Sequence, residues 1–107
     1  MTQLVRGRVY RVDLGEGVGL KPHLVVSNNR RNAALQSALA VRITTSVPPP
    51  QAAVARLAQA DPLVGHALCD RITVIYDDEV RADLGAVSRS TMQAVEGGLM
   101  YALGIDR

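Results

Sequence analysis

The stretch from residue 38 to residue 45, Ala-Leu-Ala-Val-Arg-Ile-Thr-Thr, decides the type of fold. Large aliphatic side chains alternate with other residues from Leu39 to Ile43, and this period of two predicts a β-strand with one face in the core. Arg42 and Thr44 then share the opposite face, about 6.6 Å apart along the strand. A phosphodiester can bridge that distance, because arginine can clamp phosphate with two hydrogen bonds and threonine can donate one. The other interpretation is an ordinary surface strand, in which threonine is common.

Two more strands are predicted before this one, at residues 8–14 and 23–27. Glycines at positions 15, 17 and 19 break the pattern and predict a loop of about seven residues. Lys21 follows the loop and precedes Pro22, which holds the lysine backbone extended. The loop is not a nucleotide-binding P-loop, since the Gly-x-x-x-x-Gly-Lys-Ser/Thr spacing is missing.

The C-terminal part of the chain predicts further short strands and one long helix. Ser88 is a typical N-cap residue, and Gly104 is placed to end the helix. Gly97 and Gly98 inside it cost about 1 kcal/mol each against alanine, which predicts close packing on the sheet or against a partner's helix. The remaining predictions are one or two helical turns at 28–35 and strands at 51–57, 66–76 (with a bulge near Asp70) and 85–87.

These elements predict one domain, residues 1–107, that is mostly β with a single C-terminal α-helix. Five or six short strands followed by an amphipathic helix are typical of a small curled barrel with the helix packed on it. A hydrophobic fraction of 48% can fill such a core. Because the chain has no Phe, no Trp and three Tyr, RNA binding through a row of stacked aromatic rings is not expected.

The charge is divided unevenly between the two halves of the chain. Residues 1–56 carry eight bases against two acids, a balance of +6, whereas residues 57–107 carry four bases against eight acids, a balance of −4. A basic half gives a polyanion a place to bind. Lys21 is the only lysine among twelve basic residues. Biased coding would explain an arginine-rich chain; the other interpretation is that this position favours a compact ammonium group.

Other reactive residue types give weaker indications. His23 and His66 are the only histidines, and a two-histidine ribonuclease is a possible interpretation if they meet in the fold. Cys69, the only cysteine, lies in an apolar stretch and is predicted to be buried and inert. No residue spacing suggests a metal site or a cofactor. With no disulfide, signal peptide or membrane span in view, a cytoplasmic protein is expected.

The chain resembles the MazF/PemK family of toxin endoribonucleases in stretches that follow one another in the family's order and cover nearly the whole length. They are Arg6–Leu14 (RGRVYRVDL), Lys21–Asn28 (KPHLVVSN), Val41–Ser46 (VRITTS), Cys69–Ile72 (CDRI), Leu84-Gly85 and the tail Ser88–Gly104. The resemblance implies a metal-independent enzyme with an SH3-like barrel of the CcdB/MazF type and no cofactor. It also implies an RNA substrate (mRNA, rRNA or tRNA), a homodimer and a cognate antitoxin protein.

The resemblance also implies where the reaction takes place. The family's catalytic threonine corresponds to Thr44. Where the family usually has a catalytic arginine followed by proline, this chain has Lys21-Pro22. Lysine can still neutralise phosphate as a point charge, although without the guanidinium fork. From strand periodicity, not from the resemblance, Arg42 could supply that fork, so the predicted catalytic residues are Lys21, Arg42 and Thr44.

RNA contacts are expected from basic residues, which bind phosphates, and from polar loop side chains, which read bases. The predicted RNA-binding residues are Arg8, Ser27, Asn28, Asn29, Arg30, Arg31, Thr45 and Arg71. Two other functions remain open: a toxin of the same fold that poisons DNA gyrase without cutting RNA, and an SH3-like binding module without chemistry. The first would need a partner-binding end of the C-terminal helix and no basic site around Thr44.

Overall fold

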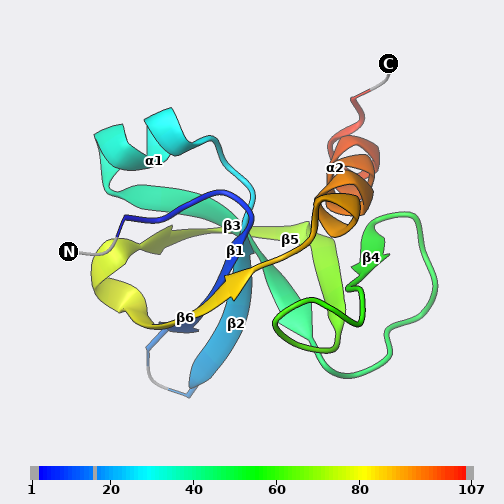
Figure 1. Ribbon diagram of the computed structural model, residues 1–107, viewed down its shortest axis with the longest axis horizontal. Coiled ribbons are helices and arrows are strands. Elements are labelled where there is room, and N and C mark those ends of the chain that lie inside the picture. Colours follow the sequence, from blue (N-terminus) through cyan, green and yellow to red (C-terminus); the bar gives the residue numbers. More distant parts are fainter. Residues whose placement is uncertain (1–2, 16, 106–107) are drawn as a thin grey trace.

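The computed structural model describes residues 3–15 and 17–105, which form one six-stranded sheet with two α-helices and a short 3-10 helix (Figure 1). In chain order the elements are β1 (Arg8–Asp13), β2 (Leu20–Val25), α1 (Asn29–Leu35), β3 (Ser37–Thr44), β4 (Val54–Arg56), β5 (His66–Tyr76), η1 (Asp77–Glu79), β6 (Val80–Ala86) and α2 (Arg89–Leu103). The strands are ordered β4-β5-β3-β2-β1-β6, and each neighbouring pair is antiparallel. The predicted mostly-β domain with one C-terminal helix is confirmed.

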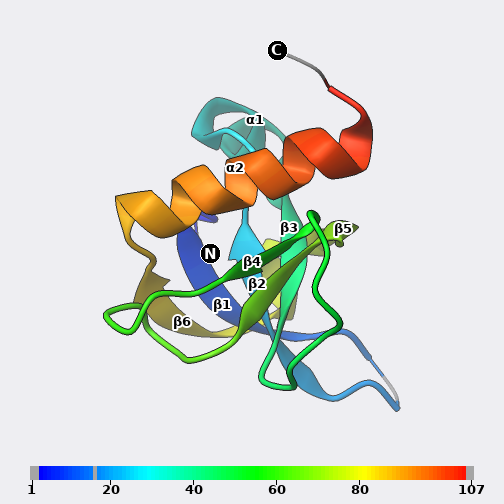
Figure 2. The same cartoon turned by 90° about the vertical axis from the view of Figure 1, so that its right-hand side faces the viewer.

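The sheet separates two hydrophobic cores, because successive residues of its strands are buried on opposite faces. One core lies under α2, which crosses that face (Figure 2); its buried members are Val9, Leu24, Val26, Val41, Ile43, Ala55, Leu57, Ala67, Cys69 and Val95. The other core lies on the opposite face and contains Leu4, Tyr10, Val12, Val25, Ala38, Ala40 and Ile75. Among the described residues β4 and β6 are the edge strands, so the curled sheet is an open barrel.

The long strand β5 bends at a bulge. Arg42 of β3 is opposite Leu68, whereas the preceding Val41 is opposite Ile72. Residues 69–71 are therefore extra on β5, which confirms the bulge predicted near Asp70. The bulge lets β5 follow the curvature of the sheet.

Helix α2 packs closely over this bulge. A Cβ atom added to Gly98 would lie 2.8 Å from the Cys69 Sγ, whereas one added to Gly97 would meet nothing within 4 Å. The predicted close packing on the sheet is thus correct for Gly98 alone. The apolar stripe of the helix is also shorter than its sequence indicates, since Leu103 is 58% exposed.

The start of α2 has two caps. The Ser88 hydroxyl accepts a hydrogen bond from the Thr91 N–H (3.2 Å), as predicted. The Asp61 carboxylate accepts from the Ser88 N–H (2.7 Å) and from the Thr91 hydroxyl (2.5 Å), which ties the loop before β5 to the helix. At the other end Gly104 takes the left-handed conformation with φ 70° that favours glycine.

Two strands differ from the prediction because of their partners on β1. Lys21 and Pro22 lie inside β2 rather than before it, since Lys21 is opposite Val12. On the other side of β1, Val80 is also opposite Val12, so β6 begins there and not at residue 85. None of the helices in the described ranges is long and apolar enough to cross a membrane.

Candidate functional site

A polar pocket of about 370 Å³ opens where β2 begins and β3 ends. It brings together all three predicted catalytic residues, Lys21, Arg42 and Thr44, and also Thr45. Its remaining lining residues are Arg11, Leu20, Pro22, Ile43, Ser46 and Leu63.

The register of the sheet explains why these side chains meet. His23 is opposite Arg42, and the β2–β3 pairs end there. Pro22 has no N–H with which to continue the ladder. Lys21 lies two residues before His23 and Thr44 two residues after Arg42, so both lie on the same face as that pair, at the end where the strands are no longer paired.

The pocket is electrostatically positive. Lys21, Arg42 and Arg11 line it, and none of its lining residues in the described part of the chain is acidic. None of these three cations forms an ion pair within residues 3–15 and 17–105. Unpaired cations in a concave site raise the local concentration of anions. Arg11 was not predicted as a site residue, because its place depends on pairing with Pro22 across β1 and β2.

The Thr44 hydroxyl has one role inside the loop. Its Oγ1 accepts a hydrogen bond from the Ser46 N–H (3.2 Å). A hydroxyl that accepts in this way still has its own hydrogen to donate. Thr44 can therefore donate to an anion in the pocket without giving up this contact.

The two histidines lie on the same face of the sheet but are not partners of each other. His23 is opposite Arg42 and His66 is opposite Thr44. His23 is 2% exposed, and its Nδ1 lies 3.1 Å from the Lys21 carbonyl oxygen, to which it donates. Burial lowers the pKa of His23, although the Lys21 carbonyl opposes this, and the nearby Arg42 lowers it further. The lowered pKa favours the neutral form of His23, whose Nδ1–H is hydrogen-bonded to the backbone of Lys21.

Three of the predicted RNA-binding side chains make contacts within the fold. Ser27 is buried, and its hydroxyl donates to the Asn32 Oδ1 (2.5 Å), so it is a structural residue and not a surface contact. Asn28 caps α1 by accepting from the Arg31 N–H (2.8 Å). The Arg31 guanidinium donates to the Ser37 carbonyl (3.0 Å).

The others are on the surface, with or without partners. The Arg8 guanidinium pairs with Asp83 (3.1 Å), and this hydrogen-bonded carboxylate raises the pKa of Arg8. The Asn29 side chain accepts from the Arg6 N–H (2.7 Å). Within the described residues the exposed side chains of Arg30, Thr45 and Arg71 make no hydrogen bond or ion pair.

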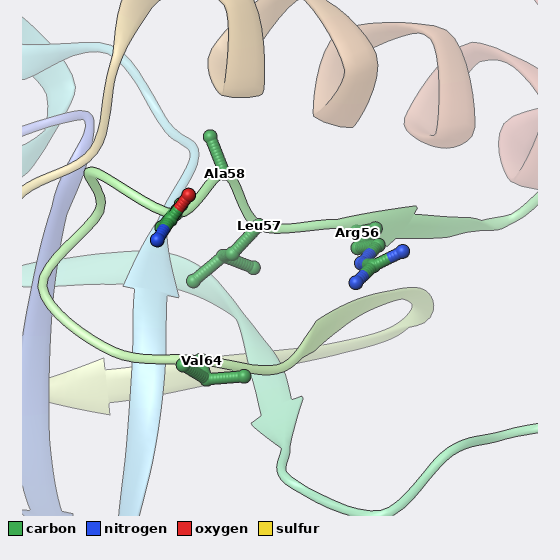
Figure 3. A pocket seen from close by; sticks show the side chains of 5 residues that line it. Arg56, Leu57, Ala58 and Val64 are labelled. Carbon is green, nitrogen blue, oxygen red and sulfur yellow. The ribbon is translucent and has the colours of Figure 1, made fainter.

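A second pocket, of about 440 Å³, lies at the end of β4. In Figure 3 Leu57 and Val64 lie in a hollow between this end and the chain that leads into β5, with Arg56 to one side. Ala58 and Gln59 complete the lining. It contains none of the predicted site residues, and Val64 at its rim is 80% exposed.

Neither Cys69 nor a cluster of metal ligands lies in the described lining of the polar pocket. Cys69 is fully buried, which confirms the prediction of a buried cysteine, and burial raises the pKa of its thiol to about 11. No group of three or more potential metal ligands lies close together among residues 3–15 and 17–105.

The fold is that of known endoribonucleases. The chain superimposes with a TM-score of 0.90 on an endoribonuclease from a mycobacterial species solved in complex with its cognate antitoxin, at 38% identity and covering 97% of this chain and 98% of that one. A second mycobacterial endoribonuclease gives a TM-score of 0.89 at 36% identity, with coverages of 100% and 97%. A MazE–MazF complex from Deinococcus radiodurans shares the fold at 19% identity, with a TM-score of 0.84 and coverages of 99% and 100%.

Sequence comparison identifies the family. Residues 5–103 match the model of the PemK-like, MazF-like toxins of type II toxin–antitoxin systems, and the chain belongs to this family. It is 41% identical over 105 residues to endoribonuclease MazF1 of Mycobacterium bovis, covering 98% of this chain and 97% of the relative. The same values hold for endoribonuclease MazF4 of Mycobacterium tuberculosis.

Proposed function

We propose that this chain is the toxin of a toxin–antitoxin pair and that it inhibits growth by cutting RNA. The observation that carries the proposal is the basic pocket lined by Lys21, Arg42 and Thr44 at the unpaired ends of β2 and β3. Relatives that share 41% identity over nearly their whole length are endoribonucleases. One similar structure contains its cognate antitoxin, and we expect an antitoxin protein to bind and silence this chain as well.

In the proposed reaction the 2′-hydroxyl of a ribose attacks the adjacent phosphorus. Arg42 and Lys21 stabilise the negative charge on the non-bridging oxygens, and Thr44 donates a hydrogen bond to one of them. The products are a 2′,3′-cyclic phosphate and a 5′-hydroxyl end. Arg42 and Arg11, which line the pocket together with Lys21, supply the guanidinium groups that a lysine lacks.

RNA binding outside the pocket would use the exposed side chains that have no partner in the fold. Arg30, Thr45 and Arg71 meet this condition, and Arg8 could exchange Asp83 for a phosphate because its ion pair is exposed. Binding that rests on phosphate contacts weakens as salt rises. We expect the toxin to act as a homodimer in the cytoplasm, where RNA is present.

The test is to incubate the purified protein with structured and unstructured RNA in EDTA. Cleavage that leaves 5′-hydroxyl ends supports the proposal and its metal independence. Intact RNA together with inhibited DNA gyrase would instead indicate a gyrase poison, and no effect on either would indicate a binding module.

The site assignment has its own test. Thr44→Ala and Arg42→Ala should each abolish growth inhibition and slow cleavage by about 10²–10³, the usual cost of one preorganised donor. Thermal unfolding of both variants should stay close to that of the parent. If both purified variants cut RNA as fast as the parent, the assignment is wrong.

A further inference from the structure

Two buried polar atoms on the described side chains have no hydrogen-bond partner. They are the Arg42 Nε and the His66 Nδ1. Buried polar atoms are almost always paired in folded proteins, and each exception needs an explanation, of which a catalytic role is one and a bound water or ion another. Both exceptions here belong to residues beside Thr44: Arg42 lies two positions before it on β3, and His66 lies opposite it on β5.

The register holds the His66 imidazole next to the Thr44 side chain. Residues directly opposite each other in an antiparallel pair point to the same face, with Cβ atoms about 4.5–5.5 Å apart. The preceding Gly65 keeps the two backbones in contact, because a Cβ there would lie 2.5 Å from the Thr44 carbonyl oxygen. His66 is also opposite Arg56 on β4, which lines the second pocket.

The reaction needs a proton acceptor, and the described residues that line the pocket include none; His66 lies beside this lining, opposite Thr44, and is not part of it. Among residues 3–15 and 17–105, the pocket's charged side chains are Lys21, Arg42 and Arg11, and no carboxylate lines it. Arginine and lysine hold their protons at neutral pH, and a threonine hydroxyl does not titrate there. Histidine is the side chain best suited to take a proton near neutrality.

We propose that His66 is the general base of the cleavage reaction, a role that rests on the proposed function of this pocket. The 2′-hydroxyl is adjacent to the phosphorus that it attacks, so its base must lie beside the group that holds the phosphate. His66 occupies that position relative to Thr44. It makes no hydrogen bond or ion pair within residues 3–15 and 17–105.

The surroundings of His23 and His66 favour His66 as the candidate base. His23 is 2% exposed and its Nδ1 is engaged by the Lys21 carbonyl. His66 is half-buried; its Nδ1 is buried without a partner, so the nitrogen that would take the proton is Nε2. The charged group opposite His66 is Arg56 on β4, and Arg42 lies on the same face of β3. No carboxylate is opposite His66 on either strand.

The proton balance of the step is simple. Neutral His66 takes the proton from the 2′-hydroxyl while the O2′–P bond forms and the P–O5′ bond breaks. The leaving 5′ oxygen takes a proton from water, and His66 then releases its proton, which restores the water. No oxidant, metal or further reactant is consumed.

The experiment compares single-turnover cleavage by the full-length parent, His66→Ala and His66→Gln between about pH 5 and 8, the range in which histidine titrates. The parent rate should rise with pH and level off, and both variants should be slower by about 10²–10⁴ with a flattened profile. Added imidazole should restore part of the rate of His66→Ala. Thr73→Ala, a polar-to-alanine change on the same strand, should keep the parent's pH profile.

The outcomes separate this inference from the proposed function. If the parent cuts RNA and Thr44→Ala does not, but His66→Ala cuts at the parent rate, the pocket is the active site and His66 has no role in it. A slower His66→Ala that keeps the parent's pH profile and does not respond to imidazole would also overturn the assignment as base. If the parent itself leaves RNA intact, the proposed function fails first.

Discussion

The two faces of the sheet differ in whether their buried polar atoms have hydrogen-bond partners. The face under α2 carries an apolar core that the helix closes, with Val95 of α2 in the same cluster as strand residues such as Ile43. The opposite face is apolar only around Tyr10 and Val25, and toward the ends of β2 and β3 it becomes polar. There the buried nitrogens of Arg42 and His66 have no partner. The comparison shows that β3 contributes to both stability and binding. Its residues that face the α2 core stabilise the fold, and the residues between them, on the opposite face, remain available for a ligand.

Adjacent residues on β3 test whether core-facing residues serve stability and their neighbours serve activity. Ile43→Ala removes a side chain that is 1% exposed and should destabilise the protein by about 2–5 kcal/mol. Thr44→Ala should slow RNA cleavage by about 10²–10³ but change the free energy of unfolding by less than about 0.5 kcal/mol. Urea unfolding and initial cleavage rates measured on the two variants would check both halves. A large stability loss in Thr44→Ala would contradict the division.

Helix α2, which covers one face of the sheet, contains two adjacent glycines whose surroundings differ. Gly98→Ala places a Cβ 2.8 Å from the Cys69 Sγ and should destabilise the protein by about 1–3 kcal/mol, as overpacking does. Gly97→Ala meets nothing within 4 Å and should stabilise it by about 1 kcal/mol through helix propensity. Equal effects of the two changes on the urea midpoint would show that α2 does not pack as described.

Acid should loosen the link between α2 and the loop before β5. Burial raises the pKa of Asp61, but hydrogen bonds from Thr91, Ser88 and Ala58 outweigh it, so the pKa lies below its usual value of 3.8. A carboxyl with a lowered pKa in the folded state stabilises the protein above its ordinary pKa and loses that effect as the pH falls through the lowered value. Asp61→Asn should therefore cost about 1 kcal/mol at pH 7 and less under strong acid. Asp70→Asn, at an exposed carboxylate, is the control in the same urea titrations.

Thiol reagents should not reach Cys69 in the core under α2. Burial raises the pKa of the Cys69 thiol to about 11, so at neutral pH it is protonated as well as inaccessible. We expect iodoacetamide to modify Cys69 only when the protein is unfolded, which mass spectrometry of samples with and without urea would detect. Rapid labelling of the native protein would mean that α2 opens readily.

The sequence predicts those features that depend on local periodicity. The alternation from Leu39 to Ile43 correctly predicts that Arg42 and Thr44 lie opposite the α2 core, and Ser88 and Gly104 correctly mark the ends of the helix. These predictions succeed because strand alternation and capping are decided by residues close together in the chain.

Features that depend on distant partners could not be predicted in the same way. Ser27, one of the predicted RNA-binding residues, is instead buried, and its hydroxyl donates to Asn32, which follows in α1. Arg11 reaches the pocket through its register with Pro22, and His66 lies opposite Thr44 only because a bulge shifts β5 along β3. A single sequence contains no signal for such registers, which long-range pairing determines.

Lys21 gives the pocket a functional group that no other side chain of the protein has. It is the only lysine in the chain, so the candidate site contains the only side-chain amine of the protein. Acetylation of that one nitrogen would remove a positive charge from the wall of the pocket and leave every arginine intact. An acetyltransferase, or an amine-reactive dye in the laboratory, would thus modify this toxin at a single side chain, and that side chain is in the proposed active site.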